Sequence, residues 1–266
     1  MDNKMIFNAI CARMDSNPLD TVLYTDAFSC LRNEGESDIA TACELNHQLM
    51  NRVAKSMLLA KENGQTKVIQ NLHDVFRKQL FYSAPYCLDD FARAIEIDRP
   101  PHKRFYAPRR HYLRPMVQGY QDVLDGKLRL LTVSMPKRAG KSQTEILFTL
   151  LLSGRFPDKS TLMEGTGDDL VKSFYNGCLE YLQTPNEYNY YDIFPAVPLV
   201  QTNADTKTIN LLNKSRFPTV MCRSIDARQV GLSEASNALI LDDCVEGREE
   251  AKNRQRLDDK WEVISG

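Results

Sequence analysis

The residues whose types and spacing best support chemistry lie in the segment 134–142, which reads SMPKRAGKS. The segment ends in the Gly-Lys-Ser signature of a phosphate-binding loop, in which backbone N–H groups at a helix start hold phosphate oxygens. Lys141 is expected to reach the β- and γ-phosphates of a bound nucleotide, and the Ser142 hydroxyl to bind magnesium. The predicted nucleotide-binding residues of the loop are Pro136, Lys137, Arg138, Ala139, Gly140, Lys141 and Ser142.

Two features of this loop leave alternatives open. Met135 stands where the full motif has its first glycine, so an ordinary strand, turn and helix with an exposed lysine is the competing interpretation. Arg138 is a candidate catalytic residue, because a guanidinium inside the loop can stabilise transition-state charge on a γ-phosphate. A solvated loop cation or a contact to a neighbouring subunit explains Arg138 equally well.

A second candidate site segment follows about 100 residues later, where the apolar run 238–241 is followed by Asp242 and Asp243. A buried strand that ends in a carboxylate is the usual partner of a phosphate loop, and Asp242 is predicted to hold magnesium through water. Asp243 occupies the position of a residue that orients the attacking water, and Glu246 is the alternative base. For Asp243 a helix cap or turn role is the competing interpretation.

The elements that must position these residues alternate between strand and helix from about residue 116 onward. Strands are predicted over 128–134, near 161–163, and over 206–213, 218–224 and 238–241, and helices over 116–124, 141–153, 168–183 and 248–262. This alternation predicts an α/β fold in which a largely parallel sheet is covered by helices on both faces. The expected architecture is a P-loop NTPase core over 116–266.

The first 95 residues differ in texture, since they contain only two glycines and two prolines. Apolar residues at helical spacing predict helices over 3–14, 19–32 and between Ser37 and Gly64, and a further helix around 68–80. Ser37 is the expected N-cap and Gly64 the expected C′ residue of the long helix. We therefore expect an all-helical domain over 1–95 and a basic, proline-rich linker over 96–115.

Composition narrows the class of protein further. The chain of 266 residues has a net charge of −1, so no global basic field points to a protein coated with nucleic acid. Seven cysteines without CxxC spacing and only four histidines show no zinc constellation, and reduced thiols in a cytosol are expected. The sequence contains no apolar run long enough to span a membrane and no signal peptide at its N-terminus, so we expect a protein that is not secreted.

Taken in order, the motifs resemble those of the large terminase subunits of tailed bacteriophages. The run VSMPKRAGKS resembles the family's MPPRHGKS loop, and Asp242-Asp243-Cys244 resembles its Asp-Asp-Pro segment. Further similarities are distributed along 105–266. They are Tyr106 to His111, Gly126 to Leu130, Phe156 to Lys159, Gly165 to Leu170, Ile193 to Pro195, Gly231 to Ser233, Glu250-Ala251 and Trp261. The departures are Lys137, Ala139 and Cys244, where the family has other residues.

This resemblance implies an ATPase that uses ATP and Mg²⁺ to drive double-stranded viral DNA into an empty procapsid. Its implied partners are the DNA, the portal protein, the small terminase subunit and further copies in a homo-oligomeric ring, all in the host cytoplasm during virion assembly. The family places adenine contacts near the basic segment, which makes His111 and Gln118 candidates for nucleotide binding. The chain ends 23 residues after Asp243, so nuclease activity is not expected in it.

Two other functions remain open from the sequence. In the first, the chain is another P-loop DNA motor, of a helicase or recombinase kind. In the second, it is a catalytically incomplete module that binds nucleotide or a partner. Three interpretations of the basic segment compete. Its cations contact a DNA backbone, they pair with nearby acidic side chains, or they form one wall of the adenine pocket. The cations concerned are Lys103, Arg104, Arg109, Arg110 and Arg114, with Tyr106 and Tyr112 between them.

Overall fold

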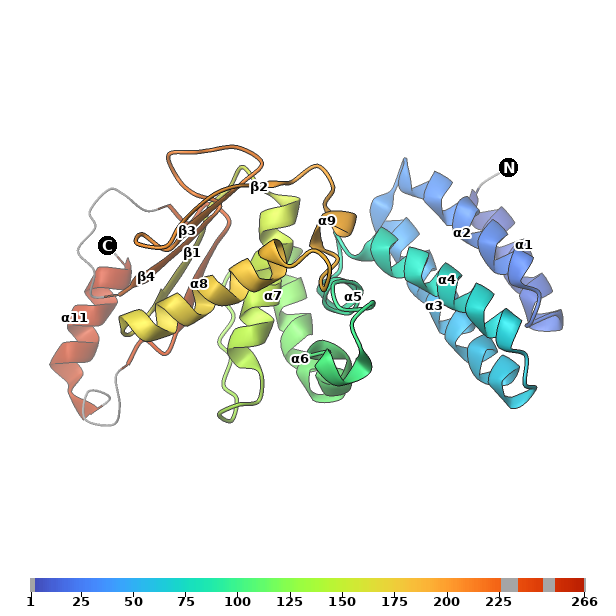
Figure 1. The fold of residues 1–266 in the computed structure, drawn as a ribbon, viewed down its shortest axis with the longest axis horizontal. Helices are drawn as coiled ribbons and strands as arrows, with labels where there is room; N and C mark the ends of the chain where they lie inside the picture. Colours follow the sequence, from blue (N-terminus) through green and yellow to red (C-terminus); the bar gives the residue numbers. More distant parts are fainter. Residues whose placement is uncertain (1–2, 226–233, 246–251, 266) are drawn as a thin grey trace. The chain divides into compact units, whose positions relative to one another are not determined.

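The computed structural model describes residues 3–225, 234–245 and 252–265 (Figure 1). The chain forms two compact units, which divide after Ile97. The first unit contains helices only, whereas the second contains a sheet with helices.

The first unit is a succession of helices in which each helix contacts the next along the chain. Its helices are α1 (Asn3–Ser16), α2 (Thr21–Gly35), α3 (Ile39–Glu62), α4 (Thr66–Ser83) and α5 (Leu88–Ala94). The predicted helical texture of this region is therefore confirmed, with α5 as an addition. Its core gathers apolar side chains from α1 to α4, including Phe7, Leu31, Leu49 and Leu72. Burial of such stripes, rather than intrinsic propensity, supplies most of the stability of packed helices.

The ends of α3 show how local sequence sets its limits. The N-cap is Asp38 rather than the predicted Ser37, because the Asp38 carboxylate accepts a hydrogen bond of 3.1 Å from the Thr41 N–H. The prediction for Gly64 is confirmed, since its φ of +66° lies in the left-handed region. The Gly64 N–H donates to the Lys61 carbonyl and the Gln65 N–H to the Ala60 carbonyl, which is a Schellman end.

The helices of the second unit are the 3₁₀ turn η1 (Pro101–Lys103), α6 (Tyr106–Leu124), α7 (Lys141–Arg155), α8 (Asp168–Gln183), α9 (Tyr190–Ile193) and α11 (Arg254–Ser265). Helices α7 and α8 begin at the predicted residues, whereas α6 begins earlier than predicted. Because α6 starts at Tyr106, the prediction of a linker up to residue 115 is wrong for its second half. Four apolar residues of α6 at helical spacing are buried, namely Leu113, Met116, Val117 and Tyr120. Their packing outweighs the cost of Pro115 inside the helix, which is about 3 kcal/mol.

The sheet of the second unit has five strands among the described residues, in the order β2-β3-β4-β1-β5. The strands are β1 (Thr161–Gly165), β2 (Leu199–Asn203), β3 (Thr208–Leu211), β4 (Val220–Ser224) and β5 (Ala238–Asp242). β1 pairs in parallel with β4 and β5, whereas β3 pairs antiparallel with β2 and β4. The α/β class is confirmed, but the sheet is mixed rather than largely parallel. The sequence analysis predicted a strand over 206–213, where β3 lies, but it missed β2 and the antiparallel hairpin that β2 and β3 form.

Helices α7 and α8 pack against each other and against β1, and α8 also packs along β4 (Figure 1). As a result all five residues of β1 are buried. β5 is the edge strand and is covered less completely, since Leu239 is 42% and Leu241 is 39% exposed. The prediction that helices cover both faces therefore fails at β5.

The predicted strand over 128–134 is not formed. The segment has no assigned strand, and Leu130 is 82% exposed. Leu131 instead lies against α6, where a Cβ added to Gly119 would stand 3.0 Å from Leu131 Cδ1. This side chain is therefore packed on a helix, and the backbone makes no ladder with the free edge of β5.

Two general properties complete the description. Among the described residues, no helix combines the length and the apolar character needed to cross a bilayer. The seven cysteines form no disulfide, and Cys11, Cys30, Cys178 and Cys222 are buried. These four behave as small apolar core side chains.

Candidate functional site

The loop before α7 has the backbone conformation of an anion-binding turn. Arg138 has a φ of +64° and Gly140 a φ of +103°, so a residue with positive φ stands on each side of Ala139. The Ala139 N–H donates to the Pro136 carbonyl over 3.2 Å. Alternation of this kind turns successive N–H groups toward one point, which is the geometry of backbone phosphate cradles.

Gly140 is required here for two reasons. Its φ is unfavourable for any residue with a side chain, and a Cβ at this position would stand 2.9 Å from Phe105 Cζ. Leu113 of α6 lies nearby, with its Cδ1 3.7 Å from the same point. The beginning of α6 therefore holds the loop in place, so the segment predicted as a linker has a structural role at the candidate site.

The loop and the end of β5, the two segments singled out in the sequence, meet in the structure. Lys141 Nζ forms an ion pair with Asp242 Oδ1 and lies 3.7 Å from Asp243 Oδ1. Ser142 Oγ donates a hydrogen bond of 2.8 Å to Asp242 Oδ2. Asp242 is 1% exposed, so its charge depends on these two partners. Although burial opposes the charge of Lys141, its hydrogen bond to Asp242 raises the pKa of this ammonium.

Asp243 is placed differently from Asp242. Its side chain is 76% exposed, and its φ of +43° puts the residue in the left-handed region. Thr166, which follows β1, donates its hydroxyl to the Asp243 carbonyl over 2.6 Å. The strained backbone is thus fixed by the neighbouring parallel strand, while the carboxylate remains accessible beside Lys141.

Glu145 belongs to this site and was missed by the sequence analysis. It is one helical turn after Lys141 and is 4% exposed. Tyr120 Oη donates to Glu145 Oε1 over 3.1 Å, whereas Oε2 has no hydrogen-bond partner among the described residues. Burial, followed by the charge of Asp242, raises the pKa of Glu145 to about 7. Burial also raises the pKa of Tyr120. The i, i+4 spacing of Glu145 from Lys141 was the sequence signal that could have identified it as a site residue. The surrounding helix is apolar, so the carboxylate was overlooked.

Two cavities border the start of α7. One, of about 320 Å³, is lined by Lys141, Glu145 and Tyr120 together with residues 129–133 and β5. The other, of about 550 Å³, lies between Ser142 and the polar side of α8, which contributes Asp169 and Lys172 among others. Both volumes are within the range of small-molecule sites, which is roughly 300–1,000 Å³.

Several other predicted site residues do not line the cavity that contains Lys141. His111 is exposed and stacks edge-on with Tyr112, and Gln118 donates to Asp122 over 3.1 Å. Neither lines the cavity that contains Lys141, so the proposed adenine contacts have no support from the geometry. Lys137 and Arg138 are exposed in the loop, and Glu246 lies outside the described residues.

The basic segment is mostly engaged within its own unit. Lys103 lies 3.8 Å from a Glu187 carboxylate oxygen, and Arg104 donates to the Arg99 carbonyl over 2.8 Å. Tyr106 is fully buried and is therefore no stacking platform for a base. Lys103 therefore pairs with a carboxylate, whereas Arg104 and Arg109 each donate to a backbone carbonyl.

The donor set at the loop fits magnesium. Ser142 Oγ and Asp242 Oδ2 are hard oxygen donors placed side by side, and Mg²⁺ prefers such ligands together with water and substrate phosphates. Lys141 supplies the cation that a phosphate also requires. The arrangement can therefore hold a magnesium-bound polyphosphate with residues that are 100 positions apart in the sequence.

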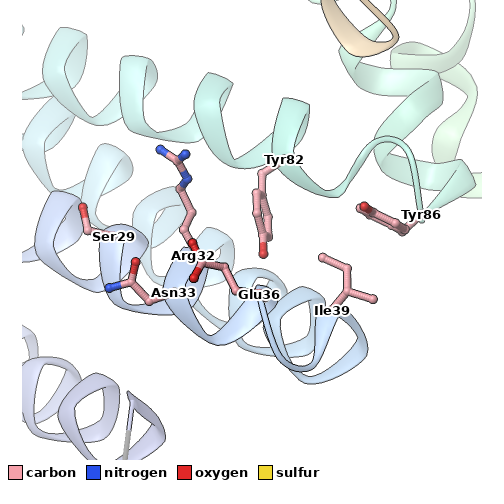
Figure 2. Close-up of a pocket in the computed structure, with 8 residues that line it drawn as sticks. Ser29, Arg32, Asn33, Glu36, Ile39, Tyr82 and Tyr86 are labelled. Atoms are coloured by element: carbon pink, nitrogen blue, oxygen red, sulfur yellow. The ribbon is translucent and has the colours of Figure 1, made fainter. Parts of the chain in front are cut away.

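The first unit has a polar cavity of its own, of about 510 Å³ (Figure 2). Its lining residues are Ser29, Arg32, Asn33, Gly35, Glu36, Ile39, Tyr82 and Tyr86. Tyr82 Oη is buried there and has no hydrogen-bond partner among the described residues. The cavity contains none of the residues predicted to do chemistry.

Comparison with known proteins finds no family model that matches the chain, no curated protein that matches it and no solved structure that matches it.

Proposed function

We propose that the second unit is a magnesium-dependent ATP-binding and ATP-hydrolysing domain of the P-loop class. The observation that carries the proposal is the meeting of Lys141, Ser142 and Asp242 at the start of α7 and the end of β5. These three residue types at this junction are the ones that phosphate and magnesium binding require.

Each residue has a separate task in this proposal. Lys141 neutralises phosphate charge, and the N–H groups of the loop hold phosphate oxygens. Ser142 and Asp242 hold magnesium, which supplies charge neutralisation between phosphates when bound. Asp243 is accessible at the same edge and is proposed to orient the attacking water, with Glu246 as the alternative base and Arg138 as a cation for the transition state.

In the structure Lys141 is already held by two carboxylates, so a bound phosphate competes with Asp242 and Asp243 for the same ammonium. Release of Lys141 toward a phosphate leaves the buried Asp242 without its cation. A magnesium ion restores that charge, which explains why nucleotide and metal are expected to bind together.

At the level of the whole chain, we propose that this ATPase drives the packaging of double-stranded viral DNA, in the manner of a large terminase subunit. The support is the order of the motifs along 105–266. The proposed partners are the portal protein, the small terminase subunit and further copies of the chain in a ring on the procapsid. The proposed location is the host cytoplasm.

A catalytically incomplete nucleotide-binding module is the second candidate. It is favoured by one observation, the absence of strand pairing in 128–134, the segment that leads into the loop. A further candidate, a P-loop motor of another kind, uses the same nucleotide site and differs only in its nucleic-acid substrate.

The binding test compares the chain with its Lys141→Ala and Lys214→Ala variants by calorimetric titration with ATP and Mg²⁺. Loss of a charged hydrogen bond predicts a 10- to 100-fold weaker affinity, on the order of 1.5–3 kcal/mol, for Lys141→Ala. Lys214 is an exposed lysine between β3 and β4, outside the predicted site, so Lys214→Ala is the control and should bind as well as the unmodified chain. Equal affinity of all three proteins would exclude the loop as the nucleotide site.

Turnover is measured on the same proteins, with and without double-stranded DNA, by phosphate release. Asp243→Asn should abolish turnover but retain ATP binding, since Asn tolerates the left-handed backbone that this position requires. ATP binding without phosphate release from the unmodified chain, with and without DNA, would favour the incomplete module.

A further inference from the structure

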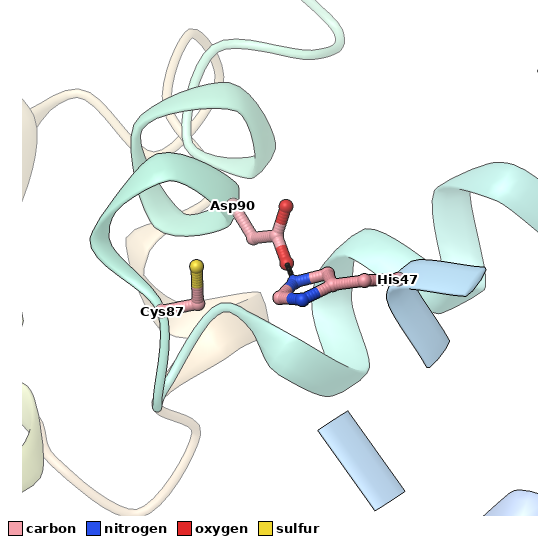
Figure 3. A group of neighbouring side chains, drawn as sticks. All are labelled: His47, Cys87 and Asp90. Atoms are coloured by element: carbon pink, nitrogen blue, oxygen red, sulfur yellow. Dashed lines mark hydrogen bonds and ion pairs between the residues drawn. The ribbon is translucent and has the colours of Figure 1, made fainter. Parts of the chain in front are cut away.

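The first unit contains a cluster of metal-ligand side chains that sequence spacing does not reveal (Figure 3). His47 comes from α3, Cys87 immediately precedes α5, and Asp90 lies in the first turn of α5. One ligand atom of each side chain lies within 4.8 Å of the other two. Within the described parts of the chain, this is the one group of three His, Cys, Asp or Glu side chains that meets this condition.

We propose that His47, Cys87 and Asp90 bind a divalent metal ion of the zinc class, with the fourth position left to water. Imidazole, thiolate and carboxylate are zinc ligands, and three protein ligands with one open position form a known type of zinc site. Magnesium and calcium are disfavoured, because they avoid sulfur and nitrogen donors.

The geometry requires only a small adjustment. Donor atoms at about 2.0–2.3 Å from a tetrahedral zinc ion lie about 3.3–3.8 Å from one another. The three ligand atoms of the cluster lie within 4.8 Å of one another, so these separations can be reached by small side-chain movements. His47 Nε2 and Asp90 Oδ2 are closer than this, at 2.6 Å, which is a hydrogen-bond distance. Separating them by about 1 Å makes room for an ion.

The surroundings of the cluster orient the carboxylate and leave a path for entry. Ser83 Oγ donates to Asp90 Oδ2 over 2.6 Å, and Arg93 donates to Asp90 Oδ1 over 3.3 Å. Such outer contacts fix a ligand in a metal site. Asp90 is 1% exposed, whereas the His47 side chain is 44% exposed, so an ion reaches the site from the imidazole side.

The ligands can also balance the charge of the ion. Zinc binds a cysteine as its thiolate and a histidine as its neutral imidazole. The Cys87 thiolate and the Asp90 carboxylate therefore supply two negative charges for one divalent ion, and any proton on a ligand atom is released to solvent on binding.

The experiment uses the full chain, treated with a chelator and then titrated with Zn²⁺, and with Co²⁺ as a spectroscopic probe. We expect one equivalent to bind and the Co²⁺ complex to show the near-ultraviolet charge-transfer band of a thiolate ligand. Cys87→Ser should abolish that band and weaken Zn²⁺ binding at least about 100-fold. His47→Gln should weaken binding similarly while circular dichroism shows an unchanged helical content.

Cys43→Ser is the matched control, since Cys43 is a half-buried thiol on α3, one turn before His47. It should retain both the band and the affinity. Calorimetry in buffers of different ionisation enthalpy should show that protons are released when Zn²⁺ binds. The proposal is overturned if the unmodified chain binds no stoichiometric ion, in which case the cluster is only a hydrogen-bond network. It is equally overturned if Cys87→Ser and Cys43→Ser give the same spectrum and affinity.

Discussion

Lys141 and Glu145 are one turn apart on α7, and both interact electrostatically with the buried carboxylate of Asp242. Lys141 neutralises Asp242, whereas Glu145 adds a second acid, one oxygen of which has no hydrogen-bond partner among the described residues. Two carboxyl groups that interact in a buried site hold a proton more readily than isolated ones. The candidate site is therefore sensitive to pH before any ligand binds.

This arrangement predicts a pH-dependent stability that Glu145→Gln removes. The pKa of Glu145 is raised from 4.5 to about 7 by folding, so the folded state holds the proton more tightly than the unfolded state does. The contribution of Glu145 to stability is therefore greatest below about pH 4.5 and is lost as pH rises through about 7. An amide in its place retains the Tyr120 contact without a charge, and it should stabilise the protein at pH 8 by roughly 3 kcal/mol.

The measurement is urea unfolding of the two proteins at pH 5 and pH 8, followed by circular dichroism. Glu180→Gln is the control, because Glu180 also accepts a hydrogen bond from a tyrosine, Tyr188, but is exposed. Parallel pH profiles for the unmodified chain and Glu145→Gln would contradict the assignment of a raised pKa.

At the scale of elements, sequence patterns predicted the bounds of a helix accurately where that helix buries a row of its own apolar residues. The predicted bounds of α8 are the observed ones, and α3 differs from its prediction mainly in its cap. Patterns failed where an element depends on a distant partner. The run 128–134 has the composition of a strand, yet it forms no ladder with β5, although residues of both segments line the same cavity.

The end of α3 offers a prediction at this scale. A Cβ at residue 64 would meet no atom within 4 Å, so Gly64→Ala tests the backbone conformation alone. Holding alanine at a φ of +66° should cost about 1–2 kcal/mol in the free energy of unfolding. Gly64→Asn should cost less, since asparagine tolerates this region. Chemical denaturation of the three proteins checks the order, and equal stabilities would show that the left-handed end is not maintained in solution.

At the scale of the molecule, the chain divides into two units that each have their own core. The core of the first unit draws on α1 to α4, and its candidate metal cluster is made by α3 and the start of α5. The candidate nucleotide site is made only by residues of the second unit. The two proposed functions are therefore separable by mutation.

This division predicts that residues 1–97 fold on their own. The isolated fragment should be helical and unfold cooperatively, because its core needs no residue from the second unit. A fragment of residues 1–86 lacks α5 and its contacts with α4, and it should unfold at a lower temperature. Thermal circular dichroism compares the two, and a fragment 1–97 without a cooperative transition would show that the first unit depends on the second.

The sequence by itself determined the local features: the helices, the Gly-Lys-Ser loop before α7, and the acidic pair after an apolar strand. These follow from neighbouring residues, since helical period, capping and loop chemistry act over a few positions. Only the tertiary structure decided which strands pair, that Glu145 is buried beside Asp242, and that His47 meets Cys87 and Asp90. Burial and electrostatic coupling depend on side chains that are up to 101 residues apart in the chain, and packing alone brings these together.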